Sequence, residues 1–385
     1  MSPFLRKLRR SAIGNFCPSA ATFFKSSVVA DFFDVTWASQ GEFFASVSCI
    51  LENSNIKEQR DVPLKSASFR KPSTKQIRIW LTAIVCGFLP LMACAKEITA
   101  CPESGITLQV LGSGGPIADD GRASSGYLVW VDGKSRFLID AGGGVFLRFA
   151  EAGGNFSELD AIGISHFHAD HSADLIALLK SGNFANRDRG LPISGPAGDG
   201  PFPGLHDYLH SLLNKDNGAY AYLNGYLEGN GILPKLEQTE IDPDTNKDVT
   251  VFSDADSDTR IQAMYVPHGI VPAIAYRIQI GDTSIVFASD QNGSSEEFLN
   301  FAKDASVLVM HMPVPEGVSG VGRALHAPPS VIGEIAAKAD VDILVLSHFM
   351  ARSLNNFADN LAIVQSEFDG PVIVADDLDC IVVGN

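Results

Sequence analysis

Short apolar runs separated by polar, glycine-rich turns recur along the chain from Ile106 onwards. ITLQVLG, SGYLVWV and RFLIDAG are the first three, and similar runs begin at Ile261, Ile285, Leu308, Ile343 and Val372. Runs of this length, rich in β-branched residues and bounded by turn residues, are typical of buried strands. A helix-like run follows His326 in ALHAPPSVIGEIA. The pattern therefore predicts an α/β domain.

The N-terminal quarter has a different pattern. Residues 1–74 are rich in Ser, Phe, Lys and Arg without a sustained period, and residues 79–95 form a 17-residue uncharged run, IWLTAIVCGFLPLMACA. Lys71, Lys75 and Arg78 precede this run, as in a secretory signal, and it is shorter than the ~20 apolar residues that span a bilayer comfortably. We predict an unstructured or mis-assigned extension (1–74), a signal peptide or lipoprotein signal (75–95) and a folded domain (96–385).

These N-terminal segments leave alternatives open. Cleavage at Ala93 to Ala95 would release the domain, lipid attached at Cys94 would tether it, and a retained anchor would face the same compartment. Residues 1–74 are either an organellar transit peptide or an upstream stretch that is not translated, because translation starts near Thr74 at a non-methionine codon. Cleavage, lipid attachment and a retained anchor each predict a periplasmic or secreted protein, with a membrane contact only through the lipid or the anchor.

Charge is distributed unevenly between these parts. Residues 96–385 hold 17 Lys plus Arg against 39 Asp plus Glu, which gives this part a formal charge of −22 within a chain of −16. A protein that grips a long phosphate backbone needs a basic surface, because neutralised phosphates supply most of the affinity. The composition therefore disfavours nucleic acid and favours a small substrate.

The most informative segment is SHFHADH, from Ser165 to His171. It places His166, His168, Asp170 and His171 within six positions of a chain that has nine histidines. Imidazole nitrogens and carboxylate oxygens are the ligands that zinc-like ions prefer, and alternate residues on a tight turn can converge on one point. The segment therefore predicts a metal site, with Asp170 and His171 directed to a second ion.

The pattern H-x-H-x-D-H after the apolar LDAIGIS resembles the signature of the metallo-β-lactamase fold superfamily, from about Ile106 to the C-terminus. Further ligands of that family have counterparts in order: His268 in VPHGIVPAIAYRI, Asp290 at the end of SIVFASD and His348 in DILVLSHFMAR. The resemblance is to the transfer-RNA 3′-processing (RNase Z) and arylsulfatase-like branches. It implies a four-layered αβ/βα sandwich, with two mixed β-sheets between outer helices.

The resemblance also implies the ligand set. His166, His168 and His268 would hold the first metal, Asp170, His171 and His348 the second, and Asp290 would bridge them. Two Zn²⁺ ions are expected, with Mn²⁺ or iron as alternatives, and they would generate a bridging hydroxide that attacks an ester centre. Asp170 could also orient this nucleophile.

Three further residues match the family less completely, and a fourth, Arg352, is not part of the family pattern. His326 corresponds to a histidine that protonates the leaving group in the RNA-processing branch. His311 takes the place of a His-Glu pair, but Met312 follows it, so His326 would lack its orienting partner. Asp140, in LIDAGGG, resembles a strand-end aspartate that orients a ligand. Arg352 would pair with an anionic substrate or close a surface salt bridge.

Two features fall outside the family pattern. Residues 195–236 form an insertion with four tyrosines among glycines, which is either a lid over the metals or a loop packed on the outer helices. Cys101 precedes the first strand and Cys380 lies in the last, so an oxidising compartment would allow them to pair.

The sequence thus predicts an exported dinuclear zinc hydrolase acting on a small phosphodiester, sulfate ester or related ester, as a monomer or homodimer. Only 21 residues separate His268 from Asp290, which leaves no room for the substrate-binding arm of the transfer-RNA enzymes. A transfer-RNA 3′-endoribonuclease is the alternative within the enzyme class. A metal-binding sensor without catalysis is the alternative from another class.

Overall fold

The computed structural model describes residues 101–229, 233–242 and 247–384. These described residues belong to one compact unit. The predicted extension (1–74) and signal segment (75–95) lie outside the described residues, so both stay predictions. Within the described ranges, no helix combines the length and apolar character needed to cross a membrane.

Two mixed seven-stranded sheets form the centre of this unit. The first has the order β14 (Cys380–Gly384), β1 (Ile106–Gly112), β2 (Gly126–Val131), β3 (Lys134–Ile139), β4 (Ala161–Gly163), β5 (Leu191–Pro196), β6 (Leu236–Ile241). The second has the order β13 (Val372–Val374), β12 (Ile343–Ser347), β11 (Val307–His311), β10 (Thr283–Phe287), β9 (Val271–Ile280), β8 (Thr259–His268), β7 (Val249–Asp254). Neighbouring strands pair in parallel from β3 to β6 and from β10 to β13, and all the other neighbouring pairs are antiparallel.

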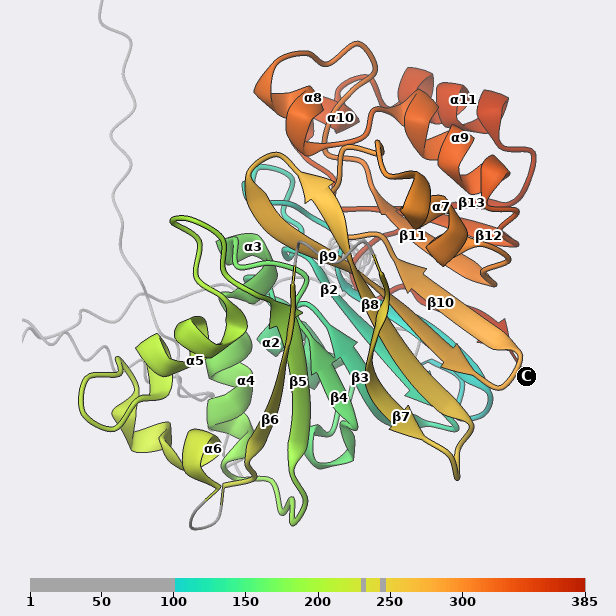
Figure 1. The fold of residues 1–385 in the computed structure, drawn as a ribbon. Helices are drawn as coiled ribbons and strands as arrows, with labels where there is room; N and C mark the ends of the chain where they lie inside the picture. Colours follow the sequence, from blue (N-terminus) through green and yellow to red (C-terminus); the bar gives the residue numbers. More distant parts are fainter. Residues whose placement is uncertain (1–100, 230–232, 243–246, 385) are drawn as a thin grey trace, which may run out of the picture. The chain divides into compact units, whose positions relative to one another are not determined.

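Helices cover the outer face of each sheet (Figure 1). The first sheet is covered by α2 (Val145–Glu151), α4 (Leu175–Gly182), α5 (Leu205–Leu213) and α6 (Gly225–Glu228), and short helices η2 (Phe156–Glu158), α3 (Ala169–Ser172) and η3 (Ala221–Leu223) lie between them in sequence. The second is covered by α7 (Glu296–Ala302), α9 (Pro329–Lys338) and α11 (Phe357–Glu367), with α8 (Val321–Leu325) and α10 (Ala351–Leu354) in the connections.

Three buried clusters separate these layers. One fills the space between the sheets, with Phe137, Tyr276 and Phe287 among its large members. The other two lie between each sheet and its own helices. Apolar side chains on both faces explain why the central strands read as almost continuous apolar runs. The predicted four-layered αβ/βα sandwich is confirmed.

The sequence pattern located most of the strands but missed β5 and the edge strands β6 and β7. In β5, LPISGP, two prolines and a glycine interrupt the apolar run. The runs expected from Ile106, Ile261, Ile285, Leu308, Ile343 and Val372 coincide with strands. The strands β6 and β7 lie at the edges, where half-exposed polar residues interrupt the apolar pattern. Polar edges prevent pairing with other chains, and they also remove the signal that identifies a strand.

The insertion packs on the helical face of the first sheet. Leu223 and Tyr226 are fully buried in the cluster there, and the Tyr226 hydroxyl donates to the Leu179 carbonyl at 2.6 Å. Tyr222 is exposed. These contacts favour the packed loop over the mobile lid.

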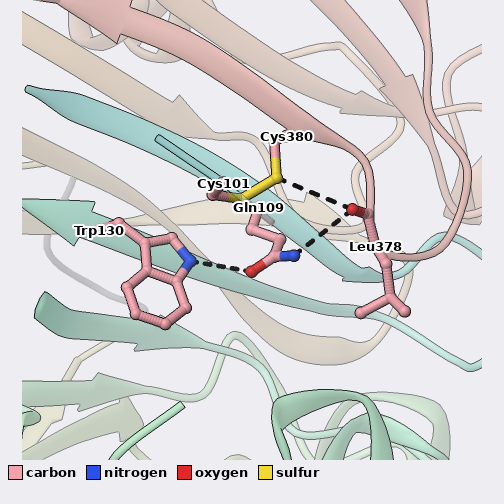
Figure 2. Close-up of a disulfide and its surroundings, with 5 residues drawn as sticks. All are labelled: Cys101, Gln109, Trp130, Leu378 and Cys380. Atoms are coloured by element: carbon pink, nitrogen blue, oxygen red, sulfur yellow. Dashed lines mark hydrogen bonds between the residues drawn. A yellow bond between two sulfur atoms is a disulfide. The ribbon is translucent and has the colours of Figure 1, made fainter. Parts of the chain in front are cut away.

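A disulfide joins the two ends of the described domain. Cys101 and Cys380 are bonded, with Cα atoms 5.5 Å apart and 279 positions apart in sequence. Figure 2 shows this bond beside the hydrogen bonds from Trp130 to Gln109 and from Gln109 to the Leu378 carbonyl. The pairing that the sequence left open is therefore present.

Candidate metal centre

Every predicted ligand lies at or just beyond the end of a strand or on the turn that follows it. Beyond β4, the chain places His166 and His168 on a loop, and Asp170 and His171 on α3. His268 ends β8, while Asp290 and His348 follow β10 and β12. Because β10, β11 and β12 are parallel, their carboxyl ends meet at the same edge. The sheet therefore fixes the backbone of residues that are distant in sequence.

Three residues at the site have a strained backbone conformation. Asp140, Ser289 and His348 have φ angles of 62°, 60° and 57°, in the left-handed region that residues other than glycine rarely adopt. Such strain persists where the surrounding structure imposes it, and it concentrates at functional sites. Beside His348, the turn at Gly112–Pro116 approaches so closely that a Cβ on Gly115 would lie 3.0 Å from the imidazole.

The first cluster contains His166, His168 and His268, with ligand nitrogens within 4.8 Å of one another. His166 Nε2 lies 2.9 Å from His168 Nδ1. His268 Nδ1 donates to the Leu325 carbonyl at 2.8 Å, which leaves Nε2 buried and without a hydrogen-bond partner. A buried orphaned imidazole nitrogen is what a metal ligand leaves when the ion is removed.

The second cluster is built around His171 and His348. Their Nε2 atoms lie 3.1 Å apart. Asp170 Oδ2 lies 3.2 Å from His348 Nε2 and 3.6 Å from His171 Nε2. The three groups thus converge as expected for ligands of one ion.

Asp290 lies between the two clusters. Its Oδ2 atom is 3.7 Å from both His171 Nε2 and His268 Nε2, and its Oδ1 atom is 3.6 Å from His348 Nε2. One carboxylate therefore faces residues of both clusters, as a bridging ligand would.

Burial and charge give these groups the protonation that metal binding requires. Burial would raise the pKa of Asp290, but His348, His326 and His171 hold it well below its usual range. Burial lowers the pKa of His166 and His268, so both are neutral. Burial also opposes charge on His171, yet Asp140 holds its pKa well above normal. Neutral imidazoles beside buried carboxylates fit a divalent cation, which would replace the His171 proton.

Asp140 orients this centre without entering it. Its Oδ2 atom accepts from His171 Nδ1 at 2.8 Å, and its Oδ1 atom accepts from the Ser165 N–H at 2.7 Å. The first contact fixes the His171 ring so that Nε2 points to the cluster. This placement agrees with the orienting position expected from LIDAGGG.

The other predicted residues lie at the margin of the centre. His326 Nδ1 is 3.8 Å from Asp290 Oδ2 and has no hydrogen-bond partner. Arg352 is directed to the protein backbone, where its Nε donates to the Pro313 carbonyl at 2.8 Å. Met312, in the position of the family's glutamate, is buried in the cluster beneath the helices of the second sheet.

Sequence reasoning gave no role to His311, which belongs to the centre. His311 Nδ1 lies 2.7 Å from Asp290 Oδ1, and His311 Nε2 lies 2.9 Å from the Tyr127 hydroxyl. The position of His311 in the sequence could have indicated this. His311 ends β11, which lies between β10 and β12, the strands that lead to Asp290 and His348. Nothing in the sequence placed Tyr127 there, since 184 positions separate it from His311.

Relatives with similar sequences are ribonucleases. Ribonuclease Z of Mycolicibacterium gilvum (strain PYR-GCK) is 27% identical over 285 residues, which cover 71% of this chain and 94% of that protein. Ribonuclease Z of Mycobacterium marinum is 26% identical over 286 residues, which cover 71% and 97%.

Solved structures share the fold at lower identity. The metallo-β-lactamase fold protein YhfI from Bacillus subtilis has a TM-score of 0.55 and 21% identity, with 72% of this chain and 98% of that chain covered. The short form of human tRNase Z has a TM-score of 0.55 and 17% identity, with 72% and 99% covered. At these identities the likeness establishes the fold alone.

A family model described as the Beta-lactamase superfamily domain matches residues 135–349. The matched segment begins in β3 and ends just beyond His348, so it includes every predicted ligand. It covers more than half of the 385-residue chain. The two sheets, the strand-end ligand clusters and this match agree: the chain belongs to the β-lactamase superfamily of metal-dependent hydrolases.

Proposed function

We propose that this protein is a dinuclear zinc phosphodiesterase that acts on a small anionic substrate. The observation that carries the proposal is the position of Asp290, whose Oδ2 atom lies 3.7 Å from ligand nitrogens of both histidine clusters. Relatives named ribonuclease, which cleave a phosphodiester, favour phosphorus over the sulfate esters that the sequence left open.

In this proposal the ligands divide as the resemblance implies. His166, His168 and His268 would hold one Zn²⁺, Asp170, His171 and His348 would hold the other, and both ions would share Asp290. When bound, two divalent ions polarise the scissile group and lower the pKa of a water toward neutrality. No serine or cysteine nucleophile is then required.

Asp170 suits the task of orienting the attacking water. Burial would raise its pKa, but a hydrogen bond from His348 and the charge of His171 lower it to about 2. Asp170 is therefore ionised at neutral pH and can accept a hydrogen bond from water. Its carboxylate is fixed on the first turn of α3, beside His171.

His326 suits the task of protonating the leaving group. Burial lowers its pKa to about 3, so at pH 7 the ring is neutral and keeps one N–H. A neutral imidazole can donate that proton to the departing oxygen as negative charge develops there. Its Nδ1 atom lies 3.8 Å from Asp290 Oδ2, and it forms a possible ligand group with His268 and Asp290, so it is close to both proposed metals.

We predict that His326→Ala lowers kcat by about 10²-fold on a dialkyl phosphodiester, because the alkoxide leaves without a proton. The same variant should stay within about threefold of wild type on bis(p-nitrophenyl) phosphate, since p-nitrophenolate needs no acid. Steady-state kinetics on both substrates, with metal content as the control, tests the role. An equal loss on both substrates would show that His326 acts otherwise.

The surface favours a small substrate. The part from residue 96 onwards has a formal charge of −22, which would repel a long phosphate backbone. A turn of two residues, Gly269 and Ile270, joins β8 and β9, so no arm projects between His268 and Asp290.

Transfer-RNA 3′-processing is the second candidate, favoured by ribonuclease Z relatives that align over 94–97% of their own length. We predict that the purified protein hydrolyses bis(p-nitrophenyl) phosphate and leaves an unprocessed transfer-RNA precursor intact at physiological salt. Hydrolysis of an aryl sulfate, a phosphomonoester and a lactone should be measured on the same preparation. Precursor cleavage at the higher kcat/KM would establish the RNA enzyme instead, and a metal-loaded protein without turnover on any substrate would indicate a sensor.

Export remains part of the proposal. It is supported by the uncharged run at 79–95 and by the Cys101–Cys380 disulfide, because structural disulfides persist in oxidising compartments. The periplasm or the exterior of the cell would meet both conditions.

A further inference from the structure

A buried tyrosine lies beneath the metal centre and belongs to neither cluster. Tyr127, on β2 of the first sheet, is 1% exposed. Its ring packs against Phe287, with centroids 5.4 Å apart, and stacks on His311 at 6.1 Å. Its hydroxyl lies 2.9 Å from His311 Nε2 and 3.0 Å from Ser347 Oγ. Tyr127 thus reaches across the sheet interface to the strand ends that carry the site.

The other side of His311 determines where its proton lies. His311 Nδ1 is 2.7 Å from Asp290 Oδ1, and an ionised carboxylate can only accept a hydrogen bond. Nδ1 must therefore carry a proton. In a neutral ring Nε2 is then an acceptor, and the Tyr127 hydroxyl, which lies 2.9 Å away and also contacts Ser347 Oγ at 3.0 Å, can donate to it.

This arrangement argues against His311 as a metal ligand, although His311, His171, Asp290 and His348 together form a group that could hold an ion, with ligand atoms within 4.8 Å of one another. Both ring nitrogens are engaged, Nδ1 by Asp290 and Nε2 by Tyr127. If the tyrosine hydroxyl were lost, the ring could move its proton to Nε2 and present the Nδ1 lone pair to the centre. Asp290 Oδ1 would then lose its donor.

We propose that Tyr127 is a positioning residue that holds His311 in the Nδ1–H tautomer, and through it sets the orientation of Asp290. The inference rests on the proposed function, since it assigns Asp290 to both metals. Groups that orient metal ligands typically affect metal affinity by ~10–100-fold. Here the orienting chain runs from Tyr127 through His311 to Asp290, a carboxylate that faces both clusters.

The test compares Tyr127→Phe with Tyr276→Phe. Tyr276 is equally buried, and its hydroxyl bonds to Ser194 and to backbone carbonyls rather than to a histidine. Tyr127→Phe should weaken zinc binding by ~10-fold or more in chelator competition and lower kcat at little-changed KM. Tyr276→Phe should do neither, although both variants lose a buried hydrogen bond and some thermal stability.

Imidazole ¹⁵N spectra of the metal-free proteins report the tautomer without any turnover. We expect the His311 signals, assigned by their disappearance in His311→Asn, to show pure Nδ1–H in wild type and a mixture in Tyr127→Phe. Asparagine places an N–H near the former Nδ1, so His311→Asn should bind zinc at least ~10-fold more tightly than His311→Leu. Adding Tyr127→Phe to His311→Asn should then change zinc affinity no further.

Two results would overturn the proposal. One is an unchanged His311 tautomer in Tyr127→Phe, and the other is an equal loss of zinc affinity from Tyr127→Phe in the wild-type and His311→Asn backgrounds. Both would mean that Tyr127 only packs. A wild-type protein that takes up no zinc would refute the proposed function instead, and the tautomer spectra would still decide the role of Tyr127.

Discussion

Replacing Asp290 with asparagine should lower kcat/KM by at least ~10³-fold and release bound metal, because one neutral amide cannot replace a carboxylate shared by two cations. Asp290 is 2% exposed and lies within 3.7 Å of nitrogens from four histidines. Asparagine has the same shape, so the fold should survive. Metal content by plasma mass spectrometry and phosphodiester kinetics on the same preparation give the two readouts.

The matched control is Asp342→Asn, which removes an exposed carboxylate just before β12. This variant should keep wild-type kinetics and metal content. If Asp290→Asn kept both metals and activity within tenfold of wild type, Asp290 would not be shared between two ions, and the division of ligands would have to be redrawn.

Loss of the disulfide should have the largest effect on stability. Changing Cys101 and Cys380 to serine should lower the free energy of unfolding by about 4 kcal/mol, since the bond closes a loop of 279 positions and restricts the unfolded chain. The bond also anchors β14. Just before this strand, the Asp377 carboxylate accepts hydrogen bonds from Ser113 and Ala123, which lie on either side of the turn at Gly115. Urea unfolding monitored by circular dichroism measures the difference.

Reductant supplies the control for this comparison. It should shift the urea midpoint of wild type toward that of the double serine variant and leave the variant itself unchanged. A wild-type midpoint that reductant does not move would contradict a stabilising bond between these cysteines.

The apolar runs predicted an α/β domain, and the resemblance to the metallo-β-lactamase fold superfamily implied the four layers and the ligand set, because the residues that carry the resemblance have local signatures. His166, His168, Asp170 and His171 lie within six positions, and Asp290 and His348 each follow an apolar run. Strands buried on both faces leave long apolar runs that are legible without a structure. The edge strands β6 and β7 were missed because solvent, rather than packing, determines half of their residues.

What the sequence could not supply is contact between distant segments. Tyr127 lies in an ordinary apolar run, and only the packing of one sheet on the other brings its hydroxyl to His311. The Cys101–Cys380 bond depends likewise on β14 pairing with β1. The sequence left open whether the insertion that contains Tyr226 is a lid or a packed loop, because the burial of Tyr226 against α4 is decided by tertiary packing.

The central claim is that two metal ions share one carboxylate in a hydrolytic site, and metal counting tests it most directly. The purified full-length protein, loaded with zinc and freed of excess ion, should contain two zinc ions per chain and hydrolyse bis(p-nitrophenyl) phosphate. His168→Ala should bind fewer ions and lose this turnover. Fewer than two ions in the wild type, or turnover unaffected by His168→Ala, would contradict the account.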